Sequence, residues 1–217
     1  MKKLLILWKQ YSFLLLLAFL FLSLLDLRFA LAAIICMAAP PLLAISRGRY
    51  WCGNLCPRGS FYDNLMSKIS KKNKIPKFFK SKILRAIMVI FLLSMFFIGV
   101  IQNWGNPYGI GMVFYRIILI TTVVGVILSL LINHRTWCQI CPMGTLSALI
   151  SKHRKNKKTL QVSSSCISCK LCSKKCPIGI VPHDYKGDHL SHPDCIQCGK
   201  CIEVCPLNMI GYNKINE

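Results

Sequence analysis

The chain has 217 residues, of which 54% are hydrophobic and 16% charged, and its mean hydropathy is +0.49. This composition is too apolar for an ordinary soluble domain of this length, so a purely soluble protein is excluded. The net charge is +21, and the 13 cysteines fall into regular motifs apart from Cys36. Because the spacings suit metal ligation in lysine-rich segments, a secreted disulfide framework is not expected.

Four apolar stretches are each long enough to cross the hydrocarbon core of a bilayer, which takes about 20 helical residues. They are residues 4–25, 29–46, 83–101 and 113–132. Their spacing predicts two helical hairpins. Charged side chains near their ends, those of Lys9, Arg85 and Arg116, are expected to extend to the lipid headgroups.

A secretory signal peptide is the alternative for the first stretch, because a basic start, an apolar run and the sequence ALA at 30–32 follow in that order. A membrane span is preferred, since Asp26 and Arg28 interrupt the run before that site and apolar sequence resumes directly after it.

Basic residues are concentrated on one side of the predicted hairpins. Residues 47–82 include ten basic residues and one acid, and the chain from residue 133 onward includes twelve basic residues and five acids. By the positive-inside rule, both termini and the central loop are expected to be cytoplasmic. The membrane itself is expected to be a bacterial inner membrane. Nucleic-acid binding would also use this charge, but topology and anionic headgroups account for it without such a partner.

An internal repeat relates the two hairpins. The segment RYWCGNLCPRGSF from Arg49 aligns with RTWCQICPMGTL from Arg135, and an amphipathic stretch and a lysine run follow each. Two copies in parallel orientation, related by an approximate two-fold axis along the membrane normal, place both cysteine pairs on the same cytoplasmic face. These cysteines are Cys52, Cys56, Cys138 and Cys141. Trp51 and Trp137 are interpreted as interfacial anchors, with shielding of a redox centre as the alternative.

The tail contains the pattern C-x2-C-x2-C-x3-C-P twice, the ligand spacing of [4Fe-4S] clusters in bacterial two-cluster ferredoxins. The fourth cysteine of each run typically ligates the other cluster. Cluster 1 is therefore assigned to Cys166, Cys169, Cys172 and Cys205. Cluster 2 is assigned to Cys195, Cys198, Cys201 and Cys176. Zinc is the rival, but zinc knuckles need no third cysteine two residues further on.

The predicted fold is a membrane all-α bundle of four transmembrane helices, arranged as two parallel-repeat hairpins, with a small α+β ferredoxin-like C-terminal domain. Residues 1–160 form the membrane domain and residues 161–217 the dicluster domain. Gly199 is expected to let the backbone approach the sulfurs closely. The connector between the two tail motifs contains three histidines and three aspartates, and a solvated loop is preferred there over a metal site.

The four upstream cysteines have three interpretations: a shared additional iron–sulfur centre, redox-active dithiols, or inert structural thiols. Duplicated motifs argue against the third. Cys36 is expected to be a small core hydrophobe. No haem is expected, because the spans contain no histidine, and no nucleotide or flavin loop is present. The outer loop 102–116 is read as a turn with interfacial aromatics, with quinol stacking on Trp104 or Tyr108 as the alternative.

Four spans, two cysteine–proline motifs at cytoplasmic span ends and two ferredoxin motifs resemble the membrane polyferredoxins of the NapH type. The same core is similar to the C-terminal half of NosR and to CcoG. The second upstream pair departs from their commoner C-x3-C spacing. The resemblance implies quinol-linked electron transfer for the NapH type, which accompanies periplasmic nitrate reductase, and a maturation role for the others.

The predicted function is electron transfer between the quinone pool or a partner subunit and a reductase complex, as a subunit that could belong to a quinol dehydrogenase. No catalytic residue is assigned, and the only metal expected is the iron of the clusters. The expected partners are the membrane, quinone and other periplasmic or cytoplasmic redox proteins. The alternatives are a maturation factor that reduces a metal or a disulfide, and a cluster-bearing redox sensor. Four lysines beside the tail ligands are expected to raise cluster potentials and attract an acidic partner, or only to solubilise the tail. They are Lys170, Lys174, Lys175 and Lys200.

Overall fold

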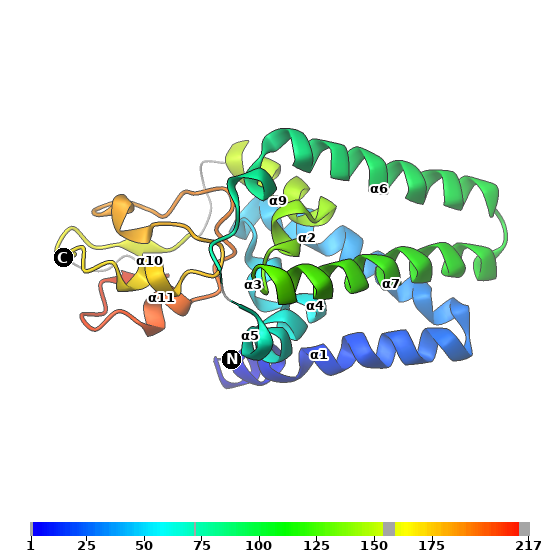
Figure 1. The fold of residues 1–217 in the computed structure, drawn as a ribbon, viewed down its shortest axis with the longest axis horizontal. Helices are drawn as coiled ribbons and strands as arrows, with labels where there is room; N and C mark the ends of the chain where they lie inside the picture. Colours follow the sequence, from blue (N-terminus) through cyan, green and yellow to red (C-terminus); the bar gives the residue numbers. More distant parts are fainter. Residues whose placement is uncertain (1, 72, 154–158, 213–217) are drawn as a thin grey trace.

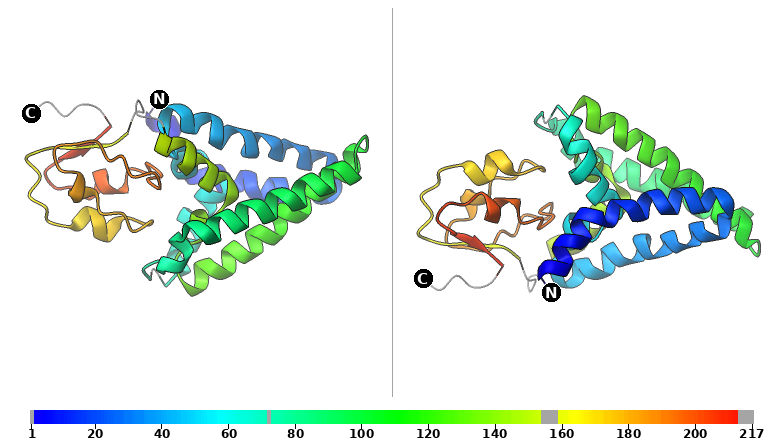
Figure 2. Two further views of the ribbon diagram at one scale, coloured as in Figure 1. Left: turned by 90° about the horizontal axis from the view of Figure 1, so that it is seen from above. Right: turned by 90° about the horizontal axis from the view of Figure 1, so that it is seen from below.

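A computed structural model describes residues 2–71, 73–153 and 159–212. Long helices lie on one side of the molecule and a small C-terminal domain lies on the other, with short helices between them (Figure 1). The two perpendicular views in Figure 2 show the same separation. The long helices are α1 Lys2–Leu25, α2 Ala33–Arg47, α6 Lys82–Gln102 and α7 Pro107–Leu131, with the 3-10 helix η1 Leu27–Ala32 joining the first two.

Four segments are long and apolar enough to cross a membrane: Leu5–Leu25, Leu27–Arg47, Lys82–Gln102 and Pro107–Leu131. These segments confirm the four predicted apolar helices, and they pair as two hairpins, α1 with α2 and α6 with α7 (Figure 1). Since α1 packs against the short helix α4, the first stretch is part of the folded structure.

The loop predicted at 102–116 is much shorter in the structure, because α7 begins at Pro107. The Asn106 side chain caps that helix by accepting hydrogen bonds from the backbone amides of Tyr108 and Gly109. Proline at the first helical position costs no hydrogen bond and presets the backbone. As a result, Arg116 lies well inside the helix instead of near its end, and its side chain is exposed.

Short helices follow each hairpin and carry the cysteine–proline motifs. After α2 come α3 Tyr50–Asn54, α4 Pro57–Phe61, the π-helix η2 Tyr62–Met66, α5 Ser67–Ile69 and the 3-10 helix η3 Lys77–Lys80. After α7 come α8 Trp137–Ile140 and α9 Pro142–His153. In both copies the proline after the second cysteine starts a helix, so each cysteine pair ends in a fixed turn.

The C-terminal domain contains one small antiparallel sheet, in which Gln161–Val162 (β1) pairs with Ile210–Gly211 (β2). Its helices are α10 Leu171–Lys175, the 3-10 helix η4 Pro182–Tyr185 and α11 Lys200–Glu203. Each strand has two residues, so the expected α+β character is present only loosely. Turns that present the cysteines occupy most of this domain.

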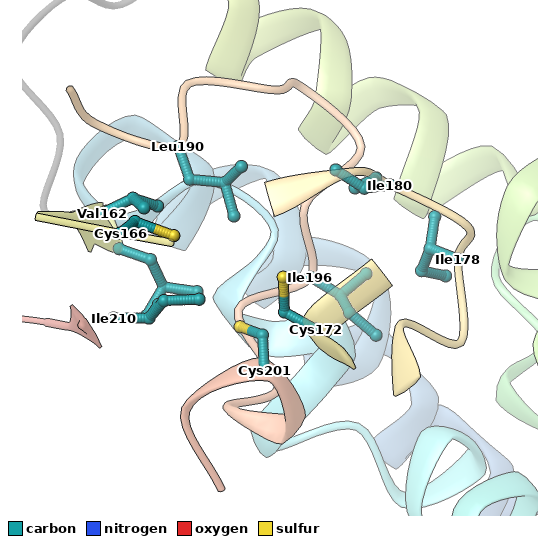
Figure 3. Packing of buried hydrophobic residues seen from close by; sticks show 10 residues of the cluster. Val162, Cys166, Cys172, Ile178, Ile180, Leu190, Ile196, Cys201 and Ile210 are labelled. Atoms are coloured by element: carbon teal, nitrogen blue, oxygen red, sulfur yellow. The ribbon is translucent and has the colours of Figure 1, made fainter. Parts of the chain in front are cut away.

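The core of the C-terminal domain mixes aliphatic side chains with cysteines. Figure 3 shows the sulfur atoms of Cys166, Cys172 and Cys201 among the side chains of this cluster. The buried aliphatic members are Leu160, Val162, Ile178, Ile180, Leu190, Ile196 and Ile210. A domain this small buries little apolar area, so groups bound by the cysteines would add to its stability.

Candidate metal centres

Four of the tail cysteines line one cavity in the C-terminal domain. They are Cys176, Cys195, Cys198 and Cys201. Cys176 comes from the first motif and the other three from the second, and Cys176 is an electrostatic neighbour of both Cys195 and Cys201. Leu160, Ile178 and Ile196 also line the cavity, so these thiols face an apolar, shielded space.

The two tail motifs share a backbone conformation at equivalent positions. Ser168 and Gln197, each before the second cysteine of its run, have φ of 54° and 51°. Lys170 and Gly199, each after that cysteine, have φ of 65° and 84°. Left-handed conformations disfavour L side chains, so Gly199 suits its position, whereas Lys170 accepts the same backbone at a cost.

The sulfur of the fourth cysteine accepts a backbone hydrogen bond in each run. The Ile180 amide donates to Cys176 Sγ at 3.4 Å, and the Met209 amide donates to Cys205 Sγ at 3.3 Å. Both donors lie four residues after their cysteine. Hydrogen bonds of this type stabilise a thiolate and tune the potential of a cluster that it ligates.

The other set of tail cysteines is less shielded. Cys166 and Cys172 are buried, Cys205 is half-buried and Cys169 is exposed. None of the 13 cysteines, all of which lie in the described residues, forms a disulfide. Within residues 2–71, 73–153 and 159–212, no three His, Cys, Asp or Glu side chains converge as a site for a single metal ion. Four cysteines that line one cavity are a donor set that fits a [4Fe-4S] cluster, and the C-x2-C-x2-C-x3-C-P spacing distinguishes this cluster from a zinc site.

The upstream cysteine pairs of the two repeats lie close together. Cys138 and Cys141 lie close enough to Cys52 to affect its pKa through their charge. Cys52 and Cys138 act on the pKa of Cys56 in the same way. Burial raises the pKa of the Cys52 thiol, and it raises the pKa of the Cys56 thiol to about 12. Reactive thiols have lowered pKa values instead. Burial therefore disfavours the free thiolate that dithiol exchange needs.

An arginine at the start of each motif reaches the other motif. Arg49 Nη2 donates to the carbonyl of Cys138 at 2.5 Å, and Arg135 Nη1 donates to the carbonyl of Cys52 at 2.9 Å. Both arginines are almost completely buried. Gly59 and Gly144 occupy equivalent places in the two repeats, and a Cβ on either would lie within 3.0 Å of an arginine Nη atom. The repeat thus builds a pseudo-symmetric contact around the four cysteines.

Each buried arginine is neutralised by a different carboxylate. Asp63, on η2, accepts from Arg135 Nε at 3.0 Å and from Arg135 Nη2 at 2.6 Å. Burial disfavours the Asp63 carboxylate, but the Arg135 guanidinium holds the pKa of that group well below its usual range. The aligned position in the second repeat is Ala148, so Arg49 has no equivalent acid within the membrane domain.

The acid that faces Arg49 is Asp194, which comes from the C-terminal domain and directly precedes Cys195. Asp194 Oδ1 lies 3.0 Å from Arg49 Nη1, and Arg85 donates to both carboxylate oxygens at 2.6 and 3.1 Å. Burial opposes ionisation of Asp194, yet these two guanidinium groups lower the pKa of the carboxylate. Arg85 was expected to extend to the headgroups, and this ion pair corrects that expectation.

The second tail motif lies directly on the first membrane motif. Lys9 Nζ donates to the carbonyl of Cys198 at 2.9 Å, and Asn54 donates to the carbonyl of Gln197 at 3.0 Å. Gln197 Nε2 in turn donates to the carbonyl of Arg47 at 2.6 Å. A Cβ on Gly53 would lie 2.0 Å from the carbonyl oxygen of Ile196, so only glycine fits there.

Several smaller predictions are corrected by these contacts. Trp137 is 3% exposed and packs with Tyr62, Met66 and Ile140, so it is a core residue and not an interfacial anchor. Cys36 lies on the exposed face of α2 and not in the core. Lys200 does not extend freely into solvent, because its Nζ lies 3.1 Å from Asp63 Oδ1.

The connector histidines do not gather as a metal site within the described residues. His183 instead contacts the Ser173 hydroxyl at 2.9 Å. The roles of Arg49, Arg135, Asp63 and Asp194 were not predicted from the sequence. Conservation of the arginine between the two repeats was the one available signal.

Two family models match the chain. A model described as a 4Fe-4S binding domain matches residues 29–76 and 115–161, and one described as a 4Fe-4S dicluster domain matches residues 165–210. The two stretches of the first match contain the two upstream motifs. The chain therefore carries ferredoxin-type 4Fe-4S domains, and electron transfer is the function that they support.

Among curated proteins, the chain is similar to methylamine utilization ferredoxin-type protein MauN of Methylobacillus flagellatus, with 30% identity over 138 residues, covering 60% of this chain and 48% of that protein. It is also similar to the uncharacterized proteins MJ0749 and MJ0750 of Methanocaldococcus jannaschii, each 27% identical, over 69% and 64% of this chain. The matches span 60% and 63% of those two proteins, so all three relatives extend well beyond the matched part. No solved structure matches the chain.

Proposed function

We propose that this protein is a multi-pass inner-membrane electron carrier with two [4Fe-4S] clusters in its tail and a further iron–sulfur centre at the four upstream cysteines. Cluster 1 is held by Cys166, Cys169, Cys172 and Cys205. Cluster 2 is held by Cys195, Cys198, Cys201 and Cys176. The bound clusters supply one-electron chemistry, while the chain positions them, shields them and supplies hydrogen bonds to sulfur.

The observation that carries the proposal is the order of the three cysteine sets along the molecule. The cluster 1 set includes the exposed Cys169, and the cluster 2 set lines a shielded cavity. The loop bearing Cys195 and Cys198 then lies on the first membrane motif, and Cys52 packs against the core of the C-terminal domain. This order suits a relay from the solvent-facing end of the domain to the membrane surface.

We infer that the membrane side of the relay exchanges electrons with the quinone pool or with a partner subunit of a reductase complex. The four apolar helices support a membrane location, and the basic residues on the side of the C-terminal domain support cytoplasmic termini. The upstream cysteines support an extra centre because both pairs converge between the helices and the tail domain.

Anaerobic purification of the full chain in detergent, with iron and acid-labile sulfide analysis, tests the proposal. Cys198→Ala is expected to remove about one cluster's iron and to weaken the matching paramagnetic signal. Cys36→Ala is the matched control for the tail clusters, because Cys36 lies outside all motifs and its sulfur is near Cys56 and not near the tail cysteines. Full iron and sulfide in Cys198→Ala, or zinc in place of iron in the wild-type protein, would contradict the proposal.

A second candidate function is the reduction of a metal ion or a disulfide for another complex. A polar cavity favours it, because Cys56 and Cys198 both line this space together with Lys9, Asp63 and Lys200. A small substrate in that cavity would lie beside two of the three cysteine sets. Turnover of a copper(II) salt or a small disulfide by the reduced protein, abolished when a bulky residue replaces Asn64 at the cavity wall, would support this function.

A further inference from the structure

We propose that residues 167–171, together with Lys174 and Lys175, form a docking surface for an acidic, soluble one-electron carrier protein of the ferredoxin or flavodoxin class. The inference rests on the proposed function and adds the place and the partner chemistry for electron exchange with cluster 1. We call this set the distal surface.

The distal surface presents apolar side chains around a cysteine. Ile167 is 67% exposed and Leu171 is 40% exposed, and Cys169 between them is the exposed member of the eight tail cysteines. An apolar centre with a polar rim is typical of surfaces that bind protein partners. An exposed ligand also shortens the route between a docked protein and the cluster.

The rim of the distal surface is basic. Lys170, Lys174 and Lys175 are exposed, and none of them forms an ion pair within the part of the chain that the structure describes. Two acids lie on elements that pack against α10: Asp184 on η4, which lies 3.7 Å from His183, and the exposed Glu203 on α11. Three lysine ammonium groups outnumber these two carboxylates and pair with neither of them, so the distal surface keeps a positive field that complements an acidic partner.

The equivalent surface of the second tail motif is already occupied. Lys200 pairs with Asp63, Gln197 and Cys198 contact the membrane domain, and Asp194 is held by two arginines. The pseudo-symmetric C-terminal domain therefore offers one motif to the membrane domain and leaves the other motif open.

The position of the distal surface favours a soluble partner over lipid. The yellow loop between β1 and α10 lies at the end of the C-terminal domain remote from the long helices in Figures 1 and 2, and α10 follows it toward the middle of the domain. With cytoplasmic termini, the nearer lipid headgroups would lie where the long helices meet the short helices, and the C-terminal domain stands between them and the distal surface. One electron passes between the docked carrier and cluster 1. Either the carrier is oxidised and cluster 1 is reduced, or cluster 1 is oxidised and the carrier is reduced, and no bond or proton is exchanged.

Stopped-flow electron exchange with two protein probes tests the inference, using the full iron-loaded chain in detergent. The probes are an acidic flavodoxin and a basic cytochrome c. The variant is Lys170→Glu/Lys174→Glu/Lys175→Glu. The matched control is Lys71→Glu/Lys74→Glu/Lys77→Glu, which makes the same charge change at three exposed lysines of the membrane domain.

The distal variant is expected to exchange electrons with flavodoxin at least about tenfold more slowly at low salt, and faster with cytochrome c, while the control stays close to wild type. High salt should reduce the difference, because it screens the charges. Equal losses in both variants would overturn the inference. Unchanged flavodoxin rates with lost binding to phosphatidylglycerol vesicles would also overturn it and assign the surface to lipid.

Failure of the inference can be told apart from failure of the proposed function. Wild-type protein without iron would contradict the proposed function itself. Iron-loaded protein that a small neutral reductant reduces normally, but whose flavodoxin rate ignores the distal lysines, would contradict only the docking surface.

Discussion

Arg49 and Arg135 form reciprocal hydrogen bonds between the two repeats. Each guanidinium donates to the carbonyl of the first cysteine in the other motif, Arg49 to Cys138 and Arg135 to Cys52. Neither arginine is exposed by more than 1%. Five donors on a rigid planar group allow each side chain to bond a carbonyl and a carboxylate at once. Contacts within the protein therefore hold the two cysteine pairs together, independently of any metal ligation.

Replacing Arg135 by Gln is expected to destabilise the folded protein by about 3 kcal/mol, because it leaves the Asp63 carboxylate without its bidentate partner. Thermal unfolding in detergent, followed by tryptophan fluorescence, measures the loss. The double variant Asp63→Asn/Arg135→Gln should recover part of the stability, since it removes both charges. A double variant as unstable as the sum of the two single variants would contradict a direct pairing.

Replacing Asp194 by Asn is expected to loosen the C-terminal domain from the membrane domain. Arg49 would then keep a buried charge without a carboxylate, which costs about 3 kcal/mol in a buried pair. Hydrogen–deuterium exchange in peptides covering residues 194–200 should rise at least about tenfold.

Asp188→Asn is the control, because the side chain of that exposed acid, in the same domain, bonds only the adjacent His189 amide in the described structure. Equal exchange in both variants would show that the ion pairs do not fix the interface.

Gly53→Ala tests the contact between motifs without changing a charge. The added methyl would lie 2.0 Å from the Ile196 carbonyl oxygen, so the backbone of the second tail motif must move. Exchange at residues 195–198 should increase. Gly99→Ala is the control, because its added methyl would lie 2.8 Å from Val113 Cγ1 and so strains the contact between α6 and α7 instead of the second tail motif. It should leave exchange at residues 195–198 unchanged.

Cys52→Ser/Cys138→Ser is expected to remove one paramagnetic signal beyond those of the two tail clusters, and to lower the iron content accordingly. The double variant removes one cysteine from each motif. It therefore disrupts a centre shared by all four cysteines and also a centre held by either pair alone. Electron paramagnetic resonance of the dithionite-reduced protein measures the change. A spectrum and an iron content identical to wild type would remove the shared centre from the proposal.

The features that sequence reasoning predicted well are those with a local or periodic signal. Apolar runs of about 20 residues predict the helices by length alone. The cysteine spacing from Cys166 to Cys176 predicts a 4Fe-4S domain, and a 4Fe-4S dicluster model matches residues 165–210. The repeat beginning at Arg49 and Arg135 indicated that the upstream cysteines converge. In each case the information lies within a short window or in a comparison of two windows.

The contacts that join the domains had no such signal. Arg49 and Asp194 are 145 residues apart, and Arg135 and Asp63 are 72 apart, so no periodicity links them. A charged residue near a span end has a simple local explanation in headgroup contact, which concealed the role of Arg85. Trp137 was misplaced for a similar reason, because its position at a span end resembles that of an interfacial aromatic.

The reciprocal hydrogen bonds of Arg49 and Arg135 also bear on the origin of the chain. A single hairpin with one motif would contain an arginine without its carbonyl acceptor and a carbonyl without its donor. Two identical half-length chains related by a two-fold axis would satisfy both, so the arrangement is one that a homodimer could have formed before gene duplication and fusion. After fusion, the two halves could diverge. Asp63 of the first half now pairs with Arg135, and Asp194 of the tail domain pairs with Arg49.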